Sequence, residues 1–204
     1  MPATEIIMTD IYPTDKYLEK YFQGASTLLD QLDYQAISQS IKYLAKLKKI
    51  RGRLFLIGVG GSAANCSHAV NDFRKICNIE SYTPADNISE LTARTNDDGW
   101  QTIFANWLKV SRLNNNDILM VLSVGGGNLK KNISVNIVKA LKYARKKKTK
   151  VIGIVSRNGG YTKKAANVVI MIPVLVEKLT TAYAESFQSV ILHAIVNSPV
   201  LCKK

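Results

Sequence analysis

The chain has 204 residues, of which 47% are hydrophobic and 21% are charged, as expected for one folded domain and not for a disordered chain. No run reaches the ~18 apolar residues of a membrane span, and the first residues lack a signal-peptide pattern, so we expect a cytoplasmic protein without a membrane partner. The three cysteines lack CxxC spacing, which argues against a disulfide framework and a zinc ribbon.

The formal net charge of +13 is high for this length. Lysine and arginine concentrate in two segments, 42–53 and 139–150, each with the pattern of a helix end that leads into an apolar strand. Such runs are typical of a solvated helix face, so we do not expect nucleic acid as a partner. A general attraction for anionic metabolites is the simpler expectation.

Apolar residues in the first 50 positions recur every three or four residues, from Tyr17 and Tyr21 to Leu44 and Leu47. This spacing predicts two helices before the first strand. We therefore divide the chain into an N-terminal helical extension, residues 1–50, and a compact domain, residues 51–204.

Short runs that are apolar throughout and stop at glycine, serine or proline predict buried strands. They are 54–58, 118–123, 151–155 and 168–172, with a further short strand expected near 79–82. Helix-length segments lie between or after them, at 62–77, 99–112, 129–147 and 179–196. Because strands that alternate with helices are joined by right-handed crossovers, we expect an α/β domain with a five-stranded parallel sheet flanked by helices.

Three of the expected strands end in polar or glycine-rich turns, at 58–62, 123–128 and 156–160. In a parallel sheet these turns meet at the carboxyl edge, where ligands bind. Glycine permits positive φ and a close approach of backbone N–H groups, and the next helix turns its positive end to the same place, with Ser62 as its expected N-cap. A tight turn from strand to helix needs glycine with or without a ligand, and this would explain one such turn. Two glycine-rich turns at successive strand ends favour anion binding.

The kind of anion stays open between two classes. Gly58, Gly60 and Ala63 match the GxGxxA form of the dinucleotide fingerprint, and Glu80 lies where a ribose-binding acid is expected. A Walker A loop is excluded because no Gly-Lys-Ser/Thr follows the glycines. A dinucleotide site does not call for the second serine-glycine turn, so we prefer a sugar phosphate.

Four motifs in order resemble the SIS (sugar isomerase) domain, in its phosphoheptose isomerase branch. They are GVGGSAANCSH at 58–68, TND at 95–97, the glycine-rich turn at 123–128 and AESFQSVILH at 184–193. The match spans roughly residues 20–200. The resemblance implies a five-stranded parallel sheet, a homotetramer with active sites near subunit interfaces, and interconversion of sedoheptulose 7-phosphate with an aldose phosphate.

The resemblance also implies roles for individual residues. The catalytic candidates are His68, Asp72, Glu185 and His193. The candidates for binding the phosphate or the rest of the substrate are Gly60, Gly61, Ser62, Asn96, Asp97, Ser123, Gly125, Gly126 and Asn128. Three positions depart from the family: Val59 replaces an asparagine, Asp72 a longer glutamate, and Gly126 a phosphate-binding serine.

Aldose–ketose isomerisation needs a base for a carbon-bound proton and an acid for the carbonyl oxygen. We assign the acid to His193 and leave the base open between Asp72 and Glu185. His68 and Asp72 lie four residues apart, and therefore on one helix face. Two histidines and two carboxylates converging between helices are also a possible zinc site, so zinc is a candidate cofactor.

Each candidate also has an ordinary structural explanation. Asp72 fits a helix-surface acid, and His193 lies among apolar residues typical of a core or an interface. Residues 96–99 read as a loop and N-cap before a helix at Trp100. Arg157 faces either a phosphate or solvent. Three functions follow in order of preference: a sugar phosphate isomerase, a non-catalytic SIS-fold binding or scaffold protein, and a dinucleotide-dependent oxidoreductase.

Overall fold

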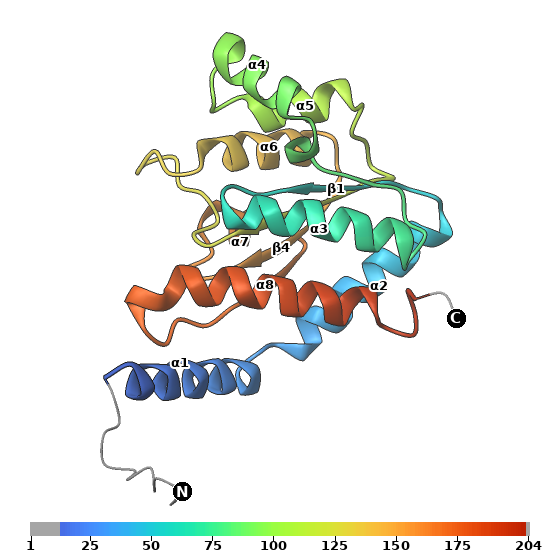
Figure 1. The fold of residues 1–204 in the computed structure, drawn as a ribbon. Coiled ribbons are helices and arrows are strands. Elements are labelled where there is room, and N and C mark those ends of the chain that lie inside the picture. The colour runs from blue at the N-terminus through green and yellow to red at the C-terminus, as the bar shows by residue number, and fades with distance from the viewer. Residues whose placement is uncertain (1–12, 203–204) are drawn as a thin grey trace, which may run out of the picture.

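The computed structural model describes residues 13–202, and its centre is a five-stranded parallel sheet (Figure 1). The strands are β1 (Leu54–Ile57), β2 (Ser81–Tyr82), β3 (Ile118–Ser123), β4 (Lys150–Val155) and β5 (Val168–Met171). Their order is β2-β1-β3-β4-β5, and every neighbouring pair is parallel. The expected α/β fold with five parallel strands is confirmed.

Helices cover both faces of the sheet, as continuous burial of its central strands requires. They are α1 (Pro13–Asp30), α2 (Tyr34–Lys49), α3 (Gly61–Lys75), α4 (Ile88–Asp98), α5 (Ile103–Val110), α6 (Val135–Lys146), α7 (Gly160–Ala165) and α8 (Thr180–Val196), with short 3-10 helices η1 (Pro84–Asp86) and η2 (Glu177–Leu179). One core contains buried residues of α2, α3 and α8, and the other those of α5 and α6. None of the helices within 13–202 is long and apolar enough to cross a membrane.

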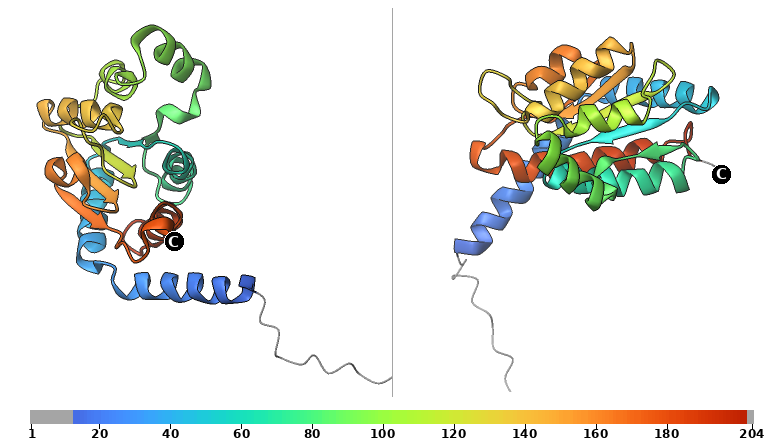
Figure 2. Two further views of the ribbon diagram at one scale, coloured as in Figure 1. Left: turned by 90° about the vertical axis from the view of Figure 1, so that its left-hand side faces the viewer. Right: turned by 90° about the horizontal axis from the view of Figure 1, so that it is seen from above.

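The two N-terminal helices differ in how deeply they are buried. Leu44 and Leu47 of α2 are buried in the same core as α3 and α8. Helix α1 lies outside that layer, as two views show (Figures 1 and 2). It is attached through Leu28, which is buried in that core, and through Tyr183, whose hydroxyl donates to the Tyr21 carbonyl at 2.7 Å. Most of the apolar residues on α1 are therefore left exposed.

Two expected helix boundaries were wrong. The segment 129–147 is helical only from Val135, because Asn128 and Ile133 pair as an antiparallel bridge that closes a small hairpin. The residues 96–98 do not form a loop before a helix at Trp100; they are the last turn of α4, which ends at Gly99 with φ 80°. The following helix starts only at Ile103.

Candidate functional site

Three of the four catalytic candidates meet at one point between α3 and α8. Nε2 of His68 lies 2.9 Å from Nε2 of His193, and Oδ2 of Asp72 lies 3.2 Å and 3.6 Å from these two nitrogens. The imidazole side chains are about half exposed, whereas the Asp72 side chain is only 12% exposed. We call these three residues the His–His–Asp cluster.

Helix packing explains why the cluster forms. His68 and Asp72 are one turn apart on α3, so they share a face, and α8 packs along that helix. Asn65 fixes the register of the two helices, because its Nδ2 donates to the Glu185 carbonyl at 2.8 Å and to Oε1 of Gln188 at 3.2 Å. Asn71 steadies the carboxylate by donating to Oδ1 of Asp72 at 3.0 Å.

The contact between the two ring nitrogens restricts where protons can lie. If both Nε2 atoms carried hydrogen, two donors would face each other at 2.9 Å, and if neither did, two lone pairs would. A single proton between the rings, or a cation that accepts both lone pairs, resolves the conflict. Asp72 places a negative charge beside both nitrogens, which favours a bound cation.

The cluster also fits a zinc ion by its donors and its spacing. It offers two imidazole nitrogens and one carboxylate oxygen, which is the His₂-carboxylate set of catalytic zinc sites. Ligands of a tetrahedral ion with bonds near 2.0–2.1 Å stand ~3.3 Å apart. The observed separations of 2.9, 3.2 and 3.6 Å bracket that value. Of the four residues expected to share a metal, these three are gathered.

Glu185 lies apart from the cluster, at the start of α3. Its carboxylate is packed so closely on Gly61 that a Cβ at that position would collide with it. It is two helical turns before His193 on α8. Glu185 therefore occupies the positive end of α3, and a phosphate dianion bound at this end would lie beside a carboxylate.

The first glycine turn otherwise has the expected shape. Gly60, at φ 64°, is the N-cap of α3, so the expectation that Ser62 caps this helix was wrong. Ser62 lies inside the first turn and is buried. Within the described chain, the N–H groups of Gly61 and Ser62 make no hydrogen bond, as is usual at a helix start, and they remain available to a ligand.

The second turn is held rigidly by the third. Ser123 Oγ accepts from the Gly126 N–H at 3.0 Å, and the Gly126 carbonyl accepts from both the N–H and the hydroxyl of Thr162 at 2.9 Å. Gly126 has φ 69°, and a Cβ there would collide with the carbonyl of Gly159. A serine is therefore excluded at Gly126 by the backbone itself, which explains this departure from the family pattern.

Other predicted residues have local partners. Asn128 accepts from the Lys131 N–H through Oδ1, and Asn96 donates to Asp97 on the exposed end of α4. Arg157, whose role was left open, forms an ion pair with Glu177 at 3.4 Å. Within residues 13–202, no hydrogen bond or ion pair joins Asn96 or Asp97 to the His–His–Asp cluster.

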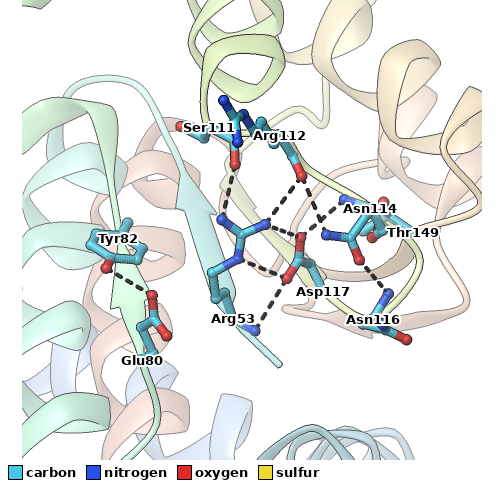
Figure 3. A network of polar contacts seen from close by, with 9 residues as sticks. All are labelled: Arg53, Glu80, Tyr82, Ser111, Arg112, Asn114, Asn116, Asp117 and Thr149. Carbon is cyan, nitrogen blue, oxygen red and sulfur yellow. Dashed lines mark hydrogen bonds and ion pairs between the residues drawn. The ribbon is translucent and has the colours of Figure 1, made fainter. Parts of the chain in front are cut away.

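The acid that a dinucleotide site requires is not at the expected end of the strand. A ribose-binding carboxylate belongs at the carboxyl end of β2, but Glu80 precedes that strand. Figure 3 shows it at the opposite edge of the sheet, where it accepts from the Tyr82 hydroxyl at 2.8 Å and lies near Arg53. The glycine turn is therefore not part of a dinucleotide fingerprint.

Comparison with known proteins decides the family. The family model described as SIS domain matches residues 20–156. The chain belongs to the SIS domain family. Within this family it falls in the phosphoheptose isomerase branch: it is 30% identical over 174 residues to the phosphoheptose isomerase of Edwardsiella ictaluri, with 82% of each chain covered. It is 26% identical over 161 residues to that of Helicobacter pylori, with 76% of each covered.

Solved structures give the same fold. The phosphoheptose isomerase of Neisseria gonorrhoeae superimposes with a TM-score of 0.78 at 20% identity, covering 90% of this chain and 97% of the other. That of Francisella tularensis gives 0.76 at 22% identity, covering 92% and 97%. At this identity the likeness supports the SIS fold, and the chemistry has to be argued from the residues of this chain.

Sequence reasoning missed three supporting residues. Asn65 and Gln188 join α3 to α8, and Gln188 is fully buried with an Nε2 that makes no hydrogen bond within residues 13–202. Thr162 ties the second and third turns together. Asn65 and Gln188 carry a usable signal, because each is a polar residue on the otherwise apolar inner face of its helix.

Proposed function

We propose that this SIS-domain protein is an aldose–ketose isomerase of a sugar phosphate, with a heptose phosphate such as sedoheptulose 7-phosphate as its substrate. The observation that carries the proposal is the His–His–Asp cluster. It brings a carboxylate and two imidazoles, one of which is our candidate acid, to one accessible point. These are the groups that proton transfer through an enediol requires.

We place the phosphate on the second turn in preference to the first. The N–H groups of Gly125 and Gly127 make no hydrogen bond within the described residues, and no carboxylate has a contact with them there. The first turn, by contrast, faces the Glu185 carboxylate through Gly61. In this arrangement Gly61 and Ser62 bind sugar hydroxyl groups, and Glu185 accepts hydrogen bonds from them.

The length of a heptose phosphate suits this arrangement. His68 is seven residues after Gly61, so the cluster lies ~10 Å from the first glycine turn along α3. An extended chain advances ~1.2 Å per bond, so the eight bonds from C1 to phosphorus in a 7-phosphate reach ~10 Å. A seven-carbon sugar phosphate is therefore long enough to span from the first turn to the cluster, and a triose phosphate falls short.

In the reaction, Asp72 removes the proton from C1 of the ketose and returns it at C2. His193 protonates the carbonyl oxygen at C2 and takes the proton from the hydroxyl at C1, so the enediol returns to a carbonyl compound. His68 holds the Asp72 carboxylate on the cluster. Zinc, if held by these three side chains, would instead supply a Lewis acid for the substrate oxygens, because its ligands could not then carry the proton.

Turnover of sedoheptulose 7-phosphate, followed by NMR, tests the proposal. Wild-type protein should form the aldose phosphate, and His193→Ala should lose 100-fold or more with its fold retained. Ser186→Ala is the control, because this exposed residue of α8 has no contact with the cluster. Binding of the sugar phosphate without any turnover by the zinc-loaded wild type would favour a non-catalytic binding protein.

The quaternary structure is a second proposal, carried by α1. Tyr17, Leu18, Phe22 and Leu29 of this helix are 51%, 43%, 64% and 44% exposed. A cluster of large apolar side chains on one exposed helix is typical of a subunit interface. We therefore propose a homo-oligomer, a tetramer as in the resemblance, in which copies of α1 bury these side chains.

A further inference from the structure

The net positive charge of the chain lies in one part of it. Residues 99–176 contain fourteen lysines and arginines and a single acid, Asp117, whereas the remaining residues contain fourteen of each. The whole formal net charge of +13 is thus carried by this segment. The segment is contiguous in space, because it forms β3, β4 and β5 with the helical layer of α5, α6 and α7.

The one acid of this segment does not offset the surface charge. Asp117 is 2% exposed. Its carboxylate accepts hydrogen bonds from the backbone N–H, Nε and Nη2 of Arg53 and from the Asn114 N–H (Figure 3). The hydrogen bond to Asp117 is also the main reason that the pKa of Arg53 is raised. The other cations of the segment are left without an acidic neighbour in it.

Many of these cations gather at the amino edge of the sheet, opposite the glycine turns, and line two hollows. One hollow, of about 500 Å³, lies where α5 and α6 end and contains Lys109, Arg112, Lys146 and Lys147. The other, of about 350 Å³, lies at the start of β4 and contains Arg145, Lys148, Lys150 and Lys164. We call the eight residues of the two hollows the basic edge.

Helix ends alone do not explain this concentration. One or two cations in the last turn are enough to complement the negative end of a helix dipole. Helix α6 is followed by an unbroken run of cations from 145 to 148. Arg112 and Lys148 also hold positive φ, at 53° and 57°, immediately after a helix, where glycine is the least strained residue.

We propose that the basic edge binds the phosphodiester backbone of a nucleic acid, without reading its sequence. Each hollow combines four cations with neutral hydrogen-bonding groups: Asn114 and Asn115 in the first, Thr149 and Asn167 in the second. Lysine, arginine, asparagine and threonine side chains are the usual partners of phosphate and sugar oxygens. Two hollows with this lining offer more than one place for the phosphates of a single chain.

The sequence alone favoured a solvated face for these lysines. Their arrangement in space argues otherwise, because cations from α5, α6, β4 and α7 are brought to the same edge. The proposal is independent of the isomerase function, since none of the cluster or glycine-turn residues is involved.

Fluorescence anisotropy with labelled 20-nucleotide single-stranded RNA, single-stranded DNA and duplex DNA tests the proposal between 50 and 200 mM salt. We expect binding by the wild type at low salt that weakens steeply as salt rises, and the three probes decide between RNA and DNA. The triple variant Lys109→Gln, Lys146→Gln, Lys147→Gln should bind at least tenfold more weakly, with a shallower salt dependence. The matched control, Lys16→Gln, Lys75→Gln, Lys178→Gln, removes the same charge elsewhere and should stay within twofold.

Three results would overturn the proposal. The first is no binding of any probe at 50 mM salt and ~10 µM protein, where sequence-independent binders associate. The second is an equal loss in both triple variants, since only total charge would then matter. The third is equally tight binding to phosphatidylserine vesicles or polyglutamate that the basic-edge variant also loses, which would assign the edge to a membrane or an acidic protein. Isomerase activity of both triple variants should equal that of the wild type.

Discussion

At the scale of single residues, the arrangement of His68, Asp72 and His193 sets the chemistry that the protein can perform. Two imidazoles in contact through Nε2 share one proton as neutral tautomers or hold one cation between them, and Asp72 would balance the charge of that cation. The shorter acid at position 72 is compatible with this geometry, because its Oδ2 reaches both rings. The substitution for the family's glutamate therefore does not by itself remove the site.

Replacing Asp72 by asparagine should abolish the base while keeping the shape of the cluster. We expect isomerase activity to fall at least 100-fold, together with zinc content measured by elemental analysis, because an amide is neutral and a poor ligand. Asp86→Asn, an exposed acid on η1, should leave both unchanged. Full activity in Asp72→Asn would transfer the role of base to Glu185.

The cysteines should differ sharply in reactivity. Burial raises the pKa of Cys66, and it also raises that of Cys77 to about 11, so both remain thiols at neutral pH. Cys202 is only partly buried. With a thiol reagent at pH 8, one cysteine should react in the native protein and three in denaturant, and rapid native labelling of two or three would contradict the described burial.

The raised pKa of Cys77 also predicts the sign of a pH effect on stability. The folded state favours the neutral thiol, so its contribution is complete below pH 9, the ordinary value, and is lost as the pH rises towards 11. Cys77→Ser, which does not ionise in this range, should show a smaller decline in the free energy of unfolding between pH 9 and 11. An equal decline in both proteins would assign the effect to other groups.

At the scale of elements, the turns at the carboxyl edge are fixed by backbone contacts that the sequence does not reveal. Gly126→Ser restores the residue usual in the family, but a side chain there meets the carbonyl of Gly159 at a positive φ. We expect the variant to be destabilised by about 1–3 kcal/mol and to lose, not gain, affinity for sugar phosphates. Denaturant unfolding and a thermal-shift titration measure the two effects, and Gly99→Ser, an open position of positive φ, is the control for backbone strain alone.

The amino edge depends on the pair of Arg53 and Asp117. Asp117→Ala removes the acceptor of three hydrogen bonds from Arg53 and one from Asn114, so we expect a loss of about 3 kcal/mol in urea unfolding. Asp86→Ala, at an exposed site, should change stability by less than ~0.5 kcal/mol. A small effect of Asp117→Ala would mean that water replaces the carboxylate.

The bounds of a helix or strand were predictable where the local sequence pattern sets them, and not where contacts with distant residues do. Strand β3 and helix α8 were predicted to within a residue, because continuous apolar runs and helical spacing carry those signals. The hairpin 128–133 was taken for helix, because its polar residues do not forbid one and the bridge between Asn128 and Ile133 has no sequence signature. Helix α4 was missed because none of its residues is buried, so it has no apolar face to detect.

Three of the predicted catalytic residues lie together in the structure, and their role in a functional site stays a prediction. The spacing of His68 and Asp72 placed them on one face, and the resemblance added His193. The separation of Glu185 from this cluster arises from its contact with Gly61, two helical turns away on a packed helix. Such a contact depends on the tertiary structure and has no counterpart in local spacing.

At the scale of the whole molecule, the exposed apolar residues of α1 predict self-association. We expect an oligomer by light scattering, and dissociation in the double variant Leu18→Glu, Phe22→Glu, because charges at a buried interface lose their hydration. The control Lys20→Glu, Ser26→Glu places the same residue at other exposed positions of α1. A monomeric wild type would contradict the proposed role of this helix.

The central claim is that the His–His–Asp cluster moves a proton between carbon atoms of a heptose phosphate. The most direct measurement is the exchange of hydrogen for deuterium when sedoheptulose 7-phosphate is incubated with the protein in heavy water, with and without added zinc, and followed by NMR. We predict deuterium at C1 of the ketose and C2 of the aldose with the wild type, and none with Asp72→Asn. A wild type that binds the sugar phosphate but neither converts it nor incorporates deuterium would contradict the account.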